Sequence, residues 1–76
     1  MRNEMFVKIA DEISDQLILI SEKNKSKDKT ILQLFKELLD DKYVEFQYEI
    51  LSYIPERLSV KGYEIVNSSR FELKKY

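Results

Sequence analysis

The amino-acid sequence predicts an α+β domain: two N-terminal helices packed on a small antiparallel three-stranded sheet, with a short third helix. Three patterns support this prediction. Apolar residues recur every three or four positions over residues 3–22, polarity alternates over residues 42–50, and two short apolar stretches flank a polar turn near the C-terminus. With 76 residues and 43% hydrophobic content, the chain can build one core, so we expect residues 1–76 to form a single domain.

The first predicted element is an amphipathic helix over residues 3–22. Its main apolar stripe contains Phe6, Ile9, Ile13, Leu17 and Ile20. Val7, Ser14 and Ile18 form a second stripe roughly 120° away, which a monomer would leave in water. Val7 and Ile18 are then either scattered surface residues or a dimer seam. Because so small a domain has little buried area, we expect a homodimer through these two side chains or through a sheet edge.

A lysine-rich loop and a second helix are predicted next. Residues 23–29 contain four lysines and no apolar side chain, which predicts a solvated loop. These lysines could touch phosphates, but no arginine or aromatic residue lies among them to grip bases. Thr30 and Gln33 form a capping-box pattern, so a helix should start there and end at Asp40 and Asp41. The face that would dock antiparallel on the first helix contains Ile31, Leu34, Phe35 and Leu38.

Residues 42–50 fit two different structures. Their alternating polarity and their aromatic and β-branched residues favour a strand, with a core side formed by Val44, Phe46, Tyr48 and Ile50. A helix is the alternative, because spacings of three and four also connect Leu39, Tyr43, Phe46, Ile50 and Ile54. We favour the strand because of this side-chain composition.

The C-terminal third predicts a short helix and a hairpin. Pro55 suits the first turn of a helix and Gly62 suits the left-handed position after its end, which predicts a helix over residues 55–61. Residues 63–66 and 70–75 are predicted to be strands joined across a polar turn. The inward side chains of this hairpin should be Ile65, Phe71 and Leu73.

The composition excludes most conventional chemistry. Without Cys or His, the chain lacks thiolate nucleophiles, imidazole acid-base groups and the usual zinc ligand sets. One glycine is too few for a glycine-rich nucleotide loop. We therefore expect no enzymatic activity, no cofactor and no bound metal. No apolar run is long enough for a membrane span or a signal peptide, which predicts a cytoplasmic protein.

Charge is unevenly distributed, although the net charge is only −1. Residues 1–20 carry two positive and four negative charges, and residues 31–49 carry two and five. This pattern predicts either a merely solubilising acidic face or one that binds a basic partner. Tyrosine suits such an interface because its ring buries area while its hydroxyl stays hydrogen-bonded. The predicted partner-binding residues are Asp11, Glu12, Asp15, Asp40, Asp41, Tyr43, Glu45 and Glu49.

The order of elements also fits a winged-helix DNA-binding regulator. Residues 55–61 would be its recognition helix and residues 67–69 the tip of its wing. Arg57, Lys61 and Arg70 would then contact DNA, which is a small number of cations for phosphate binding. A small virion structural component is a third possibility and would assemble with itself.

Residues 57–76 combine a helix end, the Gly62-Tyr63 turn and a closing hairpin, and this stretch resembles small bacteriophage-encoded α+β accessory proteins. The resemblance covers about a quarter of the chain and transfers no binding residue. A sequence rich in lysine, isoleucine and tyrosine also suits the AT-rich genes of low-GC bacteria and their phages. The resemblance implies a non-enzymatic protein that binds a host protein, such as a DNA-processing one, and inhibits or redirects it.

Overall fold

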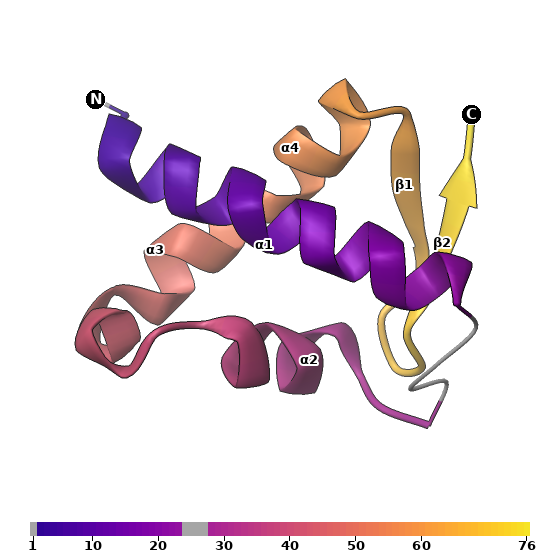
Figure 1. The fold of residues 1–76 in the computed structure, drawn as a ribbon, viewed down its shortest axis with the longest axis horizontal. Coiled ribbons are helices and arrows are strands. Elements are labelled where there is room, and N and C mark those ends of the chain that lie inside the picture. Colours follow the sequence, from indigo (N-terminus) through magenta and orange to yellow (C-terminus); the bar gives the residue numbers. More distant parts are fainter. Residues whose placement is uncertain (1, 24–27) are drawn as a thin grey trace.

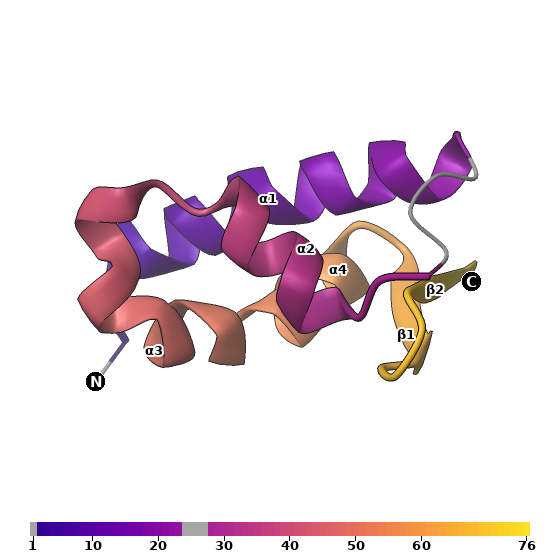
Figure 2. The ribbon, with the colours of Figure 1, turned by 90° about the horizontal axis from the view of Figure 1, so that it is seen from below.

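The computed structural model describes residues 2–23 and 28–76. Over these residues it contains four α-helices, one 3-10 helix and a two-stranded antiparallel sheet (Figure 1). The elements are α1 (Glu4–Glu22), α2 (Ile31–Leu38), η1 (Asp41–Phe46), α3 (Gln47–Ser52), α4 (Ile54–Val60), β1 (Tyr63–Asn67) and β2 (Glu72–Lys75). Helix α1 packs on α2, α3 and α4, and the hairpin lies beside its C-terminal end (Figures 1 and 2).

Side-chain caps define the starts of the first two helices. The Asn3 Oδ1 atom accepts the backbone N–H groups of Met5 and Phe6 at 3.1 and 3.3 Å, so α1 begins at Glu4. Thr30 Oγ1 accepts the Gln33 N–H at 3.1 Å, and Gln33 Oε1 accepts the Thr30 N–H at 2.7 Å. This pair of bonds confirms the predicted capping box and the start of the second helix. Residues 24–27 of the predicted lysine-rich loop lie outside the described residues.

The predicted strand at residues 42–50 is wrong, because η1 and α3 occupy this segment. The Asp40 side chain accepts the Lys42 N–H at 3.1 Å and starts the helical conformation. A strand would need a neighbouring sheet edge, and the hairpin lies at the opposite end of the molecule (Figure 1). A helical segment instead satisfies its backbone groups locally. The predicted three-stranded sheet with two N-terminal helices is therefore replaced by a two-stranded sheet and four helices.

This correction changes which side chains face water. Of the four residues expected on the core side of the strand, only Ile50 is buried. Val44, Phe46 and Tyr48 are 46, 39 and 66% exposed. The helix-type spacing that competed with the strand pattern therefore describes the segment better, since it links Ile50 with the buried residues Leu39 and Ile54.

The short helix and the hairpin predicted for the C-terminal third are confirmed, with shifted bounds: β1 extends through Asn67, and β2 begins at Glu72, two residues after its predicted start. Helix α4 ends one residue before the predicted end, and Gly62 follows with φ of 90°, a conformation that L side chains rarely adopt. Strands β1 and β2 pair with Ile65 opposite Leu73, and both side chains pack against the core. Phe71 is buried, and its N–H donates to the Lys29 carbonyl at 2.7 Å, which ties the hairpin to the segment before α2.

The core lies between α1 and the elements packed on it. Its buried members are Phe6, Ala10, Ile13, Leu17, Ile31, Leu34, Phe35, Leu39, Ile50, Ile54, Leu58 and Phe71. Val7 is also buried at 7% exposure, and Ile18 packs against the core. The expectation that a monomer leaves these two side chains in water is therefore wrong. Their exposure was the reason to expect a dimer contact through them, and that reason no longer holds. No helix in residues 2–23 or 28–76 is long and apolar enough to cross a bilayer.

Candidate functional site

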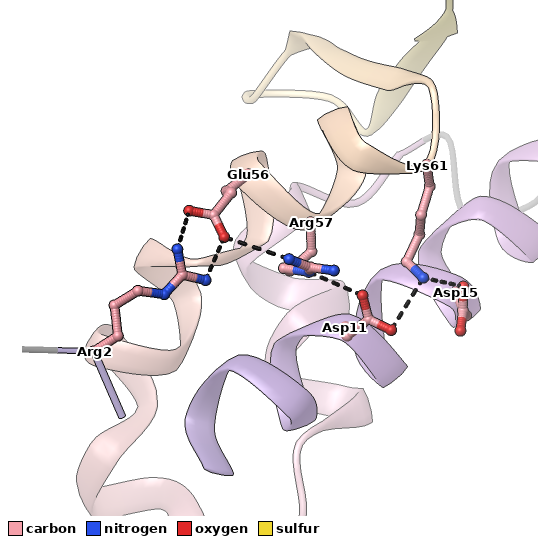
Figure 3. Close-up of polar contacts among 6 residues, drawn as sticks. All are labelled: Arg2, Asp11, Asp15, Glu56, Arg57 and Lys61. Carbon is pink, nitrogen blue, oxygen red and sulfur yellow. Dashed lines mark hydrogen bonds and ion pairs between the residues drawn. The ribbon is translucent and has the colours of Figure 1, made fainter. Parts of the chain in front are cut away.

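Two of the predicted partner-binding residues, Asp11 and Asp15, form ion pairs with Arg57 of α4 and with Lys61, the residue that follows α4 (Figure 3). Asp11 Oδ1 accepts from Arg57 Nε at 2.9 Å, and Asp11 Oδ2 accepts from Lys61 Nζ at 3.1 Å. The same Lys61 nitrogen lies 2.9 Å from Asp15 Oδ1. These contacts join residues 46 and 50 positions apart in the sequence, and they link the middle of α1 to the C-terminal end of α4.

The ion pairs continue along α4 to the N-terminal segment. Arg57 Nη1 lies 3.5 Å from Glu56 Oε1, and Arg2 Nη1 donates to Glu56 Oε2 at 2.9 Å (Figure 3). The hydrogen bond from Arg2 lowers the pKa of Glu56 below its ordinary value. Charges of alternating sign therefore run from Arg2 across α4 to Asp15, and we call this chain the α1–α4 ion-pair network.

Burial and pairing act against each other on the charges of this network. Burial raises the pKa of Asp11, but the hydrogen bonds from Arg57 and Lys61 outweigh it and bring the pKa below its ordinary value. The hydrogen bond with Asp15 raises the pKa of Lys61, and Asp11 adds to this effect. The side chains of Asp11, Arg57 and Lys61 are less than one-third exposed, so their charges are largely balanced within the molecule.

Three other predicted residues, Glu12, Asp40 and Tyr43, line a surface groove of about 530 Å³. The groove lies between α1 and the chain that connects α2 to η1. Its complete lining is Met5, Lys8, Ile9, Glu12, Ile13, Gln16, Leu38, Asp40, Lys42 and Tyr43. Tyr43 is partly buried against the core, and its ring centre lies 5.2 Å from Lys42 Nζ. The structure therefore brings an acid from α1 to the same groove as an acid and a tyrosine that follow α2.

The remaining predicted acids, Asp41, Glu45 and Glu49, are exposed on η1 and α3. Exposed apolar side chains lie among them on the same short segment. We call the whole set the η1 surface, which comprises Asp40, Asp41, Tyr43, Val44, Glu45, Phe46, Tyr48 and Glu49. Phe46 also contacts α1, because its ring centre lies 4.9 Å from that of Phe6. The η1 surface therefore contacts the rest of the molecule through Phe46 and the partly buried Tyr43, while its other side chains are exposed.

The exposure of Val44, Phe46 and Tyr48 was not predicted, because the strand pattern placed these residues on the core side. A helical projection would have shown Val44 and Tyr48 one turn apart and roughly opposite Ile50, at about 100° per residue. Met5 was not predicted as a site residue either, although it lines the groove and is 53% exposed. Met5 lies four residues before Ile9, and this spacing could have placed it on the same face of the helix.

The η1 surface offers carboxylates and aromatic rings, which suit contact with cationic and apolar groups of another molecule. Within the described parts of the chain, no three Asp or Glu side chains converge to hold a metal ion. Comparisons with protein-family models, with curated proteins and with solved structures find no match to this chain.

Proposed function

We propose that this chain acts by binding another protein, and that the η1 surface is its contact face. One observation carries the proposal. Within residues 40–49 the four acids are exposed, and so are the apolar side chains of Val44, Phe46 and Tyr48. Acids alone are explained by solubility, but exposed apolar side chains interspersed with them along one segment are typical of a binding surface.

The two kinds of side chain have different tasks in such a contact. The carboxylates attract a basic partner at long range and raise the rate of association. Aromatic side chains supply affinity, since a ring transferred from water to a partner surface buries a large apolar area with little loss of side-chain freedom. Asp11 and Asp15 belong to the α1–α4 ion-pair network, so the proposed contact face contains only the acids of the η1 surface.

The partner we propose is a protein of a bacterial host, which this chain inhibits or redirects in the manner of a phage accessory protein. The resemblance of residues 57–76 to such proteins motivates this choice. The winged-helix alternative gains no support, because Arg57 and Lys61 of its supposed recognition helix are held by the carboxylates of α1. These two side chains are 24 and 21% exposed, so little of either cation is open to a DNA phosphate.

Affinity capture with a charge-matched pair of variants tests the proposal. The test variant, Asp40→Asn with Asp41→Asn and Glu45→Gln, removes three charges from the η1 surface. Asparagine at position 40 can still accept the Lys42 N–H, so η1 should form normally. The control variant, Asp28→Asn with Glu64→Gln and Glu72→Gln, also removes three charges: two from the hairpin strands, and one next to Lys29, whose carbonyl accepts the Phe71 N–H. Tagged wild type and both variants are then incubated with a low-GC bacterial lysate, with and without nuclease.

The expected result is a protein retained by the wild type and by the control variant after nuclease treatment, and lost from the test variant. Added salt should weaken this retention, since the contact depends on charge. Equal retention by all three proteins contradicts the proposal. Retention that disappears with nuclease supports the DNA-binding alternative instead.

A further inference from the structure

We draw no further inference here: the strongest candidate, the surface groove between α1 and the connection from α2 to η1, is lined by two acids and two lysines among apolar side chains, so nothing in the structure shows what covers it.

Discussion

Replacing Ile50 and Tyr48 separately by alanine tests the conformation of residues 42–50. In a strand these two side chains would share the core side, and both losses would be costly. In the structure Ile50 is fully buried within the core, whereas Tyr48 is 66% exposed on the same helix, α3. The two substitutions should therefore have very different effects on the free energy of unfolding.

The size of the difference follows from burial. Ile50→Ala removes three carbons from a site with no exposed surface, which should lower the free energy of unfolding by about 3 to 4 kcal/mol. Tyr48→Ala removes a side chain that is mostly in water, so its effect should stay within about 0.5 kcal/mol. Ile50→Val is a graded control and should cost about 1 kcal/mol. A domain of this size is stable by only about 4 to 11 kcal/mol, so Ile50→Ala should lose much of its stability.

Urea unfolding followed by far-ultraviolet circular dichroism measures these differences. The wild type and the three variants should share one dependence of free energy on urea, so their midpoints report stability directly. The order of midpoints should be wild type and Tyr48→Ala together, then Ile50→Val, then Ile50→Ala. A Tyr48→Ala midpoint as low as that of Ile50→Ala would refute the helical arrangement and restore the strand.

Three further predictions concern single side chains. Pairing holds the pKa of Asp11 below its ordinary value, so its contribution to stability is present above the pKa of Asp11 in the unfolded chain and is lost as pH falls through the lower folded pKa. In urea unfolding, Asp11→Asn should therefore be less stable than the wild type at neutral pH, and the difference should shrink in acid. A difference in unfolding free energy that does not change with pH would contradict this prediction. Ser14 is fully buried, and its hydroxyl has no hydrogen-bond partner among the described residues. Ser14→Ala should therefore increase the free energy of unfolding by about 1 kcal/mol and raise the melting temperature. A lower melting temperature would show that the hydroxyl forms a hydrogen bond. A Cβ at Gly62 would meet no atom within 4 Å, but the φ angle of Gly62 is 90°. Gly62→Ala should therefore lower the free energy of unfolding in urea by about 1 to 2 kcal/mol through backbone strain. An unchanged urea midpoint would argue against the left-handed turn.

The sequence predicted the elements whose signals are local. The Thr30 cap begins α2 through a bond to a residue three positions away, and Gly62 ends α4 through its own backbone conformation. The hairpin followed from two apolar stretches around a polar turn. The conformation of residues 42–50 was predicted wrongly, because their apolar residues fit both a strand pattern and a helix pattern. Only contacts with residues distant in the sequence select the helical conformation.

The candidate site was predicted in part. The acids of residues 40–49 are exposed as expected, and Glu12 lies in the groove with Asp40 and Tyr43. Asp11 and Asp15 are engaged by α4 instead, and the exposed apolar side chains of the η1 surface came only with the structure. Acidity can be read from composition, whereas the availability of each acid depends on which cation the fold places beside it.

By itself, the sequence determined the capped start of α2, the glycine turn, the closing hairpin and the acidic character of residues 40–49, because each depends on residues close together in the chain. The tertiary structure decided that residues 42–50 are helical, that Val7 is buried in the monomer, and that Asp11 pairs with Arg57 across 46 positions. These outcomes depend on packing between α1 and the elements that follow it, where a side chain gains or loses solvent according to its neighbours in space.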